Sequence, residues 1–307
     1  MEIESADDMN WVFERLDSCV NCGGRGFRTI FREVRCGIPL QFDQCTDCSF
    51  IFQNPRLTRE SLGDYFNSSI FIQDSKSNND PISAQLGYFD YFSWDQSYKK
   101  TAAIRLNRLN KFRPTPGKLL EIGSATGSFL DSARTFGYQV RGLDVSRTFA
   151  EGAKQRYGLD IDVGWIEDFP LPSETYDAVC MFGGISCWRD LMKGLANVHQ
   201  TLRPSGVFYF NYQDYYGLLG RLMGNRYPEF NHASLSLLHR RSIHDCLAKS
   251  GFRVLVDVTE RQIASFERIV TYLKIGAARR LVTALGLGNI EIPIWVSGTK
   301  IVVAAKC

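Results

Sequence analysis

The sequence lacks any apolar run that approaches the roughly 18 residues needed to span a bilayer, so it does not predict a transmembrane helix. It also lacks a basic start followed by an apolar stretch, because its first ten residues, MEIESADDMN, are acidic and polar. A secretory signal is therefore not predicted. The formal net charge of +3 over 307 residues is too small to indicate nucleic-acid binding by itself. Together these absences predict a cytoplasmic protein.

Histidine is scarce, with four residues, whereas cysteine is frequent, with nine. An odd number of cysteines without a secretory signal argues against a disulfide framework. Five of the cysteines are scattered, and we interpret them as free thiols that pack like small hydrophobic residues. The other four form two close pairs, which predict a different role.

Those pairs are Cys19-x-x-Cys22 and Cys45-x-x-Cys48, separated by 22 residues. Two such pairs can place four thiolates tetrahedrally around Zn²⁺. Four protein ligands leave no open coordination position, so the predicted zinc is structural and not catalytic. A redox pair is the alternative, although a redox CxxC normally belongs to a thioredoxin-like βαβ unit. We therefore predict a zinc ribbon over residues 15–57.

Downstream of this ribbon, short apolar strands alternate with helical patterns. Strands are expected at 118–122, 138–143, 161–163, 176–181, 206–211, 252–258 and 300–305. This alternation predicts an α/β fold, a Rossmann-like, doubly wound and mostly parallel sheet of seven strands. Helices are expected at 84–112 and 262–285 as well.

The predicted organisation has three regions: a zinc ribbon at 15–57, a helical linker or lid at 58–112 that contributes to the active site, and a catalytic domain at 113–307. Within the last region, residues near 212–240 form an insertion that we expect to cover the substrate.

A glycine-rich turn in LLEIGSATGSF, residues 119–129, lies between a predicted strand and a predicted helix. Glycine allows a tight turn and a close approach to a ligand, and the helix N-terminus offers unpaired amides. Asp144, at the tip of the next strand, can accept hydrogen bonds from both ribose hydroxyls of an adenosine.

Two cofactor classes compete for this turn. A dinucleotide fingerprint needs a middle glycine where the backbone approaches the pyrophosphate, and that position is Ala125 here. S-adenosylmethionine carries no phosphate, so the turn favours it over NAD. An ordinary βα turn without a ligand is the remaining alternative.

From Tyr65 to the C-terminus the sequence resembles class I S-adenosylmethionine-dependent methyltransferases, in the broad group that includes the ubiquinone-biosynthesis O-methyltransferases. The matching blocks are LLEIGSATGSF, RGLDVS, IEDFP followed by YDAV, LRPSG and AKSGF. The resemblance implies that the glycine-rich turn holds the amino-acid part of S-adenosylmethionine, Asp144 the ribose, and Asp168 with the Phe169 amide the adenine. The cofactor-binding residues that it implies are Glu121, Gly123, Ser124, Gly127, Phe129, Asp144, Val145, Asp168 and Phe169.

The segment CTDCSFIFQNPRL, residues 45–57, resembles the head of one bacterial methyltransferase group whose members act largely in sugar, polysaccharide and natural-product pathways. Zinc heads also occur on some ribosomal RNA guanine methyltransferases. The NPR continuation and the lack of a basic, aromatic-interleaved ribbon favour a small-molecule acceptor, such as a hydroxyl of a sugar, nucleotide sugar or glycan intermediate. RNA methylation and a non-catalytic module that binds the cofactor are the alternatives.

The sequence identifies a general base less clearly than it identifies the cofactor-binding residues. Relatives often carry a Glu-His pair after the fourth strand, where this chain has Ser186 and Cys187. His232, in NHASL, loosely resembles a histidine in the insertion of relatives, and we take it as the candidate base or substrate contact.

Two further segments have two interpretations each. The aromatic group at 88–94 either lines an acceptor pocket or only packs. The basic stretch at 266–287 is interpreted as a solvated helix face, with contact to a membrane surface or a phosphorylated acceptor as the alternative. The sequence does not indicate the oligomeric state.

Overall fold

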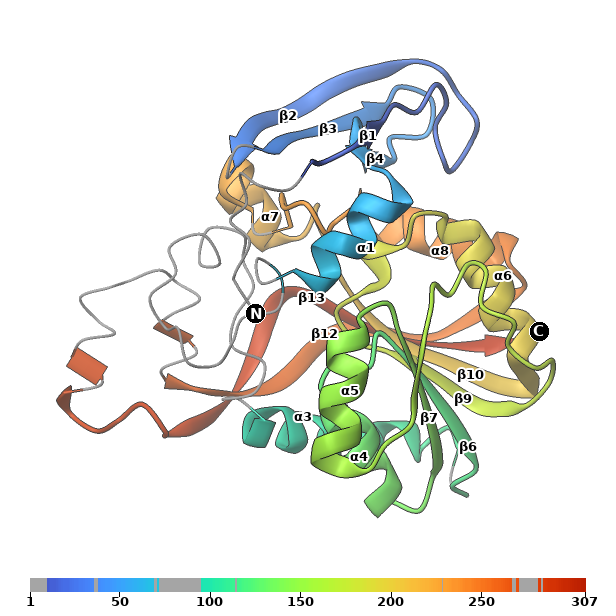
Figure 1. Ribbon diagram of the computed structural model, residues 1–307, viewed down its shortest axis with the longest axis vertical. Helices are drawn as coiled ribbons and strands as arrows, with labels where there is room; N and C mark the ends of the chain where they lie inside the picture. Colours follow the sequence, from blue (N-terminus) through green and yellow to red (C-terminus); the bar gives the residue numbers. More distant parts are fainter. Residues whose placement is uncertain are drawn as a thin grey trace.

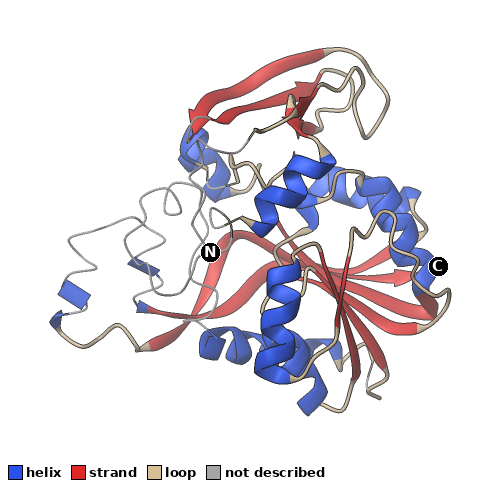
Figure 2. Cartoon of the chain, viewed as in Figure 1, coloured by secondary structure: helices blue, strands red, loops and turns tan. Residues whose placement is uncertain are grey.

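The computed structural model describes residues 10–35, 38–68, 71, 95–113, 115–227, 229–266, 269–270, 281–282 and 284–307. A large sheet with helices on both sides forms the main body, and a smaller sheet lies above it in Figure 1. Figure 2 shows the same arrangement by secondary structure, with strands at the centre of the main body and helices around them.

The main sheet has seven strands in the order β12-β13-β10-β9-β6-β7-β8, which confirms the predicted α/β sheet. Its strands are β6 (Lys118–Ile122), β7 (Gln139–Asp144), β8 (Ile161–Val163), β9 (Tyr176–Met181), β10 (Leu202–Gln213), β12 (Phe252–Ser265) and β13 (Glu291–Lys306). All neighbouring pairs from β10 to β8 are parallel, whereas β13 is antiparallel to both β10 and β12.

Helices cover both faces of this sheet because its strands are apolar on both faces. In β9, Ala178 and Cys180 pack with one hydrophobic cluster, and Val179 and Met181 pack with the other. The first cluster includes α3 (Asp95–Leu109) and α4 (Ser128–Thr135), and the second includes α6 (Leu191–Thr201) and α8 (Arg240–Lys249). Strands buried on both faces are expected in a doubly wound sheet.

The remaining described elements are α1 (Arg59–Asn67), α5 (Arg147–Tyr157), η2 (Ile185–Cys187), α7 (Leu218–Met223), η3 (Gly224–Arg226), β1 (Phe13–Glu14), β2 (Phe27–Arg35), β3 (Ile38–Cys45), β4 (Ile51–Gln53), β5 (Arg56–Leu57) and β11 (Ser236–Leu237). We call residues 10–57 the N-terminal module. Its sheet has the order β11-β4-β3-β2, so the short strand β11 is supplied from far along the chain.

That pairing joins the segment predicted to be a substrate-covering insertion to the N-terminal module. Ser236 of β11 pairs with Phe52 of β4. Phe230 stacks on Phe31 at a centroid distance of 4.1 Å, and Tyr227 belongs to the same buried cluster. The module and the insertion therefore share one hydrophobic core.

The expectation of a helix at 262–285 is wrong at its start. β12 continues to Ser265, and Gln262 pairs with Ile294 of β13. Cross-strand pairing with a distant segment overrides the local helical pattern. For the same reason the expected strands at 252–258 and 300–305 are too short. Residues 271–280, and the aromatic group at 88–94, lie outside the described residues.

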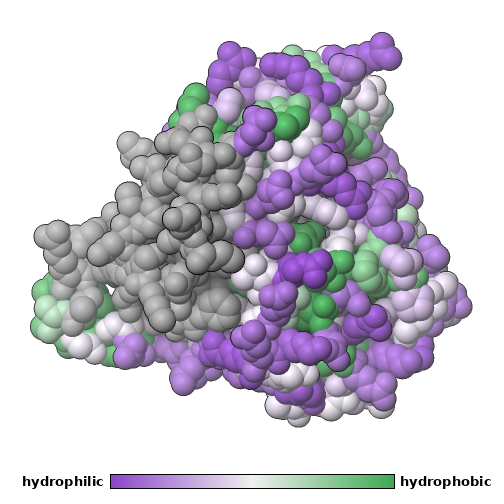
Figure 3. Space-filling view, viewed as in Figure 1, coloured by the Kyte–Doolittle hydropathy of each residue, from purple (hydrophilic) through white to green (hydrophobic). Residues whose placement is uncertain are grey.

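None of the helices in the described part of the chain is long and apolar enough to cross a membrane. On the face shown in Figure 3, the described surface is mostly hydrophilic, and its hydrophobic residues form small separate patches.

Candidate active site

Two adjacent cavities open at the carboxyl ends of β6, β7 and β9, the edge where open α/β sheets bind ligands. The first has a volume of about 150 Å³ and is called the Asp144 cavity here. The second, of about 410 Å³, is called the Asn211 cavity. The residues that line both are Gly123, Ala125, Phe182 and Gly183.

The glycine-rich turn after β6 forms much of this shared wall. Gly123 and Gly127 have φ angles of 66° and 77°, in the left-handed region that favours glycine. A Cβ at Gly127 would lie 2.8 Å from Leu159, so the turn also needs the missing side chain for space. At Gly123 the nearest atom to such a Cβ would be Met181 Cε at 3.9 Å, which leaves open space beside the backbone.

Asp144 is at the end of β7 and is 7% exposed. Its Oδ2 accepts a hydrogen bond from the Ala125 amide at 2.7 Å, and its Oδ1 accepts one from the Ser146 amide at 2.8 Å. Burial raises the pKa of the Asp144 carboxyl, and these amide donors partly oppose that rise. The carboxylate is thus fixed in direction, with acceptor capacity left for a ligand.

Glu121 and Ser124 have polar atoms without partners beside the same turn. Glu121 is 4% exposed, and its Oε2 has no hydrogen-bond partner among the described residues. The Ser124 Oγ has none there either. Burial raises the pKa of Glu121 well above its usual value, although the Arg105 guanidinium partly opposes this. Buried polar atoms without partners are rare, and both residues line the Asn211 cavity.

One wall of the Asp144 cavity is apolar and aromatic. Phe66 from α1 and Trp165 lie against each other with ring centroids 6.1 Å apart, and both line the cavity with Val145. This surface suits a flat aromatic ring.

Asp168 and Phe169, predicted to meet the adenine, do not line the Asp144 cavity. The Asp168 carboxylate forms ion pairs with Lys193 and Arg59 at the surface, and these two cations lower its pKa. The Phe169 ring packs so close to Gly164 that a Cβ there would lie 2.5 Å from it. Their contact with a cofactor stays a prediction.

Of the nine predicted cofactor-binding residues, the two cavities are lined by Glu121, Gly123, Ser124, Phe129, Asp144 and Val145. Gly127 contributes through the conformation of the turn.

Sequence reasoning missed a buried polar network in the wall of the Asn211 cavity. Its centre is Glu260 of β12, whose side chain is 2% exposed. This carboxylate accepts hydrogen bonds from three side chains that line the cavity, Arg105 at 2.6 Å, Asn211 at 2.8 Å and Gln262 at 2.7 Å. The Asn211 Oδ1 in turn accepts a hydrogen bond from the Gly183 amide at 2.6 Å. A single carboxylate therefore positions much of one wall.

His232 lies away from both cavities. It is 0% exposed, and its Nε2 is 3.3 Å from the carbonyl oxygen of Ile38 in the N-terminal module. No histidine lines either cavity within the described residues. Cys187 does line the Asp144 cavity, and burial raises the pKa of its thiol to about 12. The role of His232 as base or substrate contact stays a prediction.

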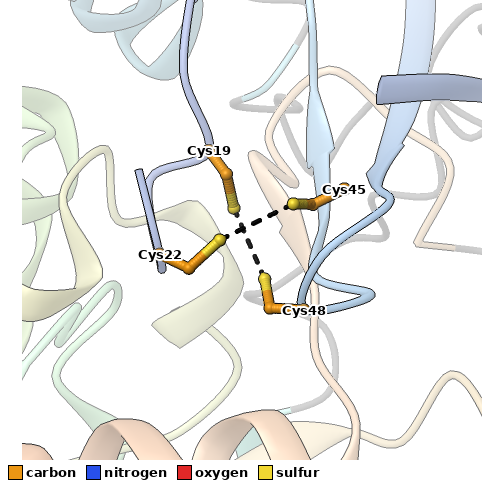
Figure 4. A group of neighbouring side chains, drawn as sticks. All are labelled: Cys19, Cys22, Cys45 and Cys48. Carbon is orange, nitrogen blue, oxygen red and sulfur yellow. Dashed lines mark hydrogen bonds between the residues drawn. The ribbon is translucent and has the colours of Figure 1, made fainter. Parts of the chain in front are cut away.

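The four cysteines meet at one point of the N-terminal module, as Figure 4 shows. The Sγ atoms of Cys19 and Cys48 are 3.6 Å apart, as are those of Cys22 and Cys45. Four thiolates arranged tetrahedrally at about 2.3 Å from Zn²⁺ would lie about 3.8 Å from one another. The donor set and its spacing therefore fit a zinc ion.

Comparison with known proteins gives a consistent result. A family model described as a methyltransferase domain matches residues 94–256. An uncharacterized methyltransferase, YdaC, from Bacillus subtilis (strain 168) is 31% identical over 104 residues, which are 32% of this chain and 58% of YdaC. A demethylmenaquinone methyltransferase from Chlorobaculum parvum is 28% identical over 94 residues, 30% of this chain and 39% of that protein. The chain thus spans about half the length of these relatives.

Two solved structures share the fold. The magnesium protoporphyrin IX methyltransferase of Synechocystis PCC 6803, with bound SAH, has a TM-score of 0.52 at 12% identity, and the match covers 81% of this chain and all of that chain. The cyclase SpnF has a TM-score of 0.50 at 16% identity, with 69% of this chain and 82% of that chain covered. At such identities the similarity shows the fold alone.

Proposed function

The chain belongs to the methyltransferase-domain family, whose model matches more than half of its length, and on this basis we propose that it transfers a methyl group from S-adenosylmethionine to a small-molecule acceptor. The observation that carries the proposal is the pairing of the Asp144 carboxylate with the glycine-rich turn at the junction of the two cavities. When bound, S-adenosylmethionine supplies an electrophilic methyl group.

The residues of the Asp144 cavity fit that donor. The Asp144 carboxylate would accept hydrogen bonds from the ribose hydroxyls, and Phe66, Val145 and Trp165 would surround the adenine. The unpartnered Glu121 Oε2 and Ser124 Oγ would meet the amino-acid part, which would extend from the Asp144 cavity into the adjoining Asn211 cavity. A charged donor ammonium would also compensate the buried Glu121 carboxylate, whose one nearby cation among the described residues is Arg105.

The part of the Asn211 cavity beyond Glu121 and Ser124 would hold the acceptor. It shares its wall with the Asp144 cavity at Gly123 and Gly183, so a ligand in each would be placed side by side. Holding two reactants in a productive orientation is a large part of such catalysis. We further propose that the acceptor group is a hydroxyl of a sugar, nucleotide sugar or glycan intermediate, as the resemblance of residues 45–57 implies. His232 remains our candidate base from the same resemblance.

We also propose that the four-cysteine cluster holds one structural Zn²⁺ ion. The four thiols lie within 4.8 Å of one another, and four protein ligands leave no position for substrate. Metal analysis of the freshly purified protein should give one zinc per chain, and a metal-free folded protein would refute this assignment.

The proposed activity is tested in two steps. Titration calorimetry with S-adenosylhomocysteine should show binding, with NAD as the control ligand. Radiolabelled S-adenosylmethionine is then incubated with nucleotide sugars, a lipid extract and total RNA. Label in the nucleotide sugars is the expected result. Label in RNA alone would favour the alternative of RNA methylation, and binding without transfer to any pool would favour a non-catalytic module.

A further inference from the structure

The N-terminal module supports two segments that border the Asp144 cavity, and the first of these is α1. This helix begins two residues after β5 and places Phe66 in the cavity wall. At its last residue, the Asn67 Oδ1 accepts a hydrogen bond from the Arg147 amide at 3.0 Å. Arg147 begins α5, and the preceding residue, Ser146, donates its amide hydrogen to Asp144. The module is thereby connected to Phe66 in the aromatic wall of the cavity and to Asp144 in its acidic wall.

The second segment is the stretch 185–189 after β9, which contains Cys187 and Trp188 of the cavity wall. The Gln53 amide of β4 donates a hydrogen bond to the Leu235 carbonyl at 2.9 Å. The Leu235 amide then donates to the Ser186 carbonyl at 2.8 Å. One end of the segment is therefore joined to the module through backbone hydrogen bonds.

The other end is held by two arginines. The Arg56 Nη1 donates a hydrogen bond to the Arg189 carbonyl at 2.8 Å, and the Arg189 Nη1 donates to the Leu57 carbonyl at 2.7 Å. Both guanidinium groups also contact the carboxylate of Glu14. The two arginine side chains are only 11% and 13% exposed, and charge-assisted hydrogen bonds of this kind are strong when shielded from water.

Two of the four cysteines are close to these supports along the chain. Cys45 ends β3, and Cys48 lies in the turn between β3 and β4, which is followed by β5 and α1. Cys19 and Cys45 also belong to the hydrophobic cluster that contains Trp188. Two of the cysteines and the cavity wall thus share one hydrophobic cluster, and Arg56 joins β5 of the same module to the segment that carries Trp188.

We propose that metal binding by the four cysteines and donor binding in the Asp144 cavity are energetically coupled, with Arg56 as the positioning residue between them. This inference rests on the proposed function, because it takes S-adenosylmethionine or its product as the ligand of that cavity. Without the metal, the two cysteine turns lose the cross-link that holds them together, and the adjoining strands β4 and β5 become less ordered. Donor binding must then order Phe66 and Trp188 again, which lowers the affinity.

Coupling of two binding sites is reciprocal, so the test has two directions. In the first, calorimetry measures the Kd of S-adenosylhomocysteine for the zinc-loaded full-length chain and for Arg56→Met, which keeps the aliphatic stem and removes the donors. We expect about 5-fold weaker binding in Arg56→Met, at the lower end of typical coupling between sites. Arg32→Met is the control, because Arg32 is in the same module and, within the described part of the chain, donates its hydrogen bond to Gln41.

In the second direction, equilibrium competition for zinc with the chromogenic chelator 4-(2-pyridylazo)resorcinol is measured with and without saturating S-adenosylhomocysteine. The ligand should lower the Kd for zinc by about 5-fold in the unmodified chain and clearly less in Arg56→Met. A loss of folding stability alone would not produce this difference.

Equal affinities of Arg56→Met and the unmodified chain for S-adenosylhomocysteine, with zinc retained by both, would overturn the coupling and leave the proposed function intact. Failure of the unmodified chain to bind S-adenosylhomocysteine at all would overturn both.

Discussion

The two cavities differ in how they are built. The Asp144 cavity depends on a backbone turn and a carboxylate at consecutive strand ends, joined by one hydrogen bond between Ala125 and Asp144. The Asn211 cavity depends on side chains from α3, β10 and β12 that meet at one buried carboxylate, Glu260. Local geometry at two strand ends fixes the turn and the acid of the first, whereas long-range packing fixes the polar wall of the second. The two should therefore respond differently to substitution.

The largest effect is expected at Glu260. Glu260→Ala leaves the Arg105 guanidinium, 13% exposed, without its partner. Breaking a buried ion pair from one side costs about 3–5 kcal/mol, which guanidinium chloride unfolding would measure as a lower free energy of unfolding. Glu260→Gln should lose less, because it keeps one carbonyl acceptor and the shape. A loss below about 1 kcal/mol in Glu260→Ala, within the range of an ordinary surface substitution, would contradict the network.

Asp144→Ala should act mainly on ligand binding. Two charge-assisted hydrogen bonds to ribose hydroxyls would be lost, at about 1.5–3 kcal/mol each, so the Kd of S-adenosylhomocysteine should rise by at least about 100-fold. Calorimetry of Asp162→Ala gives the control, since Asp162 pairs with Arg141 near the surface and lines neither of the two cavities. Similar affinities in both variants would place the ribose elsewhere.

The same contrast explains what the sequence could predict. The turn from Gly123 to Gly127 and the acid at Asp144 are local patterns at strand ends, where ligand chemistry restricts the residue types. The four-cysteine cluster is equally predictable from the sequence, because metal ligands have characteristic spacing. In the sequence, by contrast, Glu260 is one charged residue in a polar stretch. Nothing local predicts its role, because its partners Arg105 and Asn211 are far away in sequence.

The error at residues 262–265 has the same origin. Their pairing with 291–294 needs a register that no local window contains. The link between β11 and β4 was missed for this reason also, although each strand follows an ordinary pattern. Local sequence patterns do not show which distant segments pair with each other.

The Glu121→Gln substitution tests the buried carboxyl beside the glycine-rich turn through the pH dependence of folding stability. Burial raises the pKa of Glu121, so the stability associated with its neutral form is fully present below the ordinary glutamate pKa. That stability is lost as the pH rises through the raised pKa. Thermal unfolding should show Glu121→Gln to be more stable than the unmodified chain at pH 8, where the buried glutamate is ionised at a cost and the glutamine stays neutral.

At pH 4 the two proteins should have similar stability. At pH 8 the variant should also bind S-adenosylmethionine more weakly, since it lacks the charge that meets the donor ammonium. Higher affinity in Glu121→Gln would reverse the role assigned to this carboxyl.

The smallest effect is expected at Asp168. Asp168→Asn removes a surface carboxylate that pairs with Arg59 and Lys193, and exposed ion pairs contribute about 0–1 kcal/mol. Calorimetry of donor binding tests the predicted contact with the adenine, because loss of a surface ion pair alone should change the affinity by no more than about twofold. A much larger loss would bring Asp168 into contact with the adenine, as the resemblance implies, and would extend the Asp144 cavity beyond its described lining.

The position of β13 has a practical consequence for protein production. This strand, at the very end of the chain, is inserted between β10 and β12. A truncated protein that stopped at residue 256, where the family match ends, would lack the middle strand of the antiparallel half. β10 and what remains of β12 would then each present an unpaired row of amides and carbonyls, a known template for self-association. Expression boundaries for this enzyme family member should therefore follow the strand order in space and retain the last sixteen-residue strand.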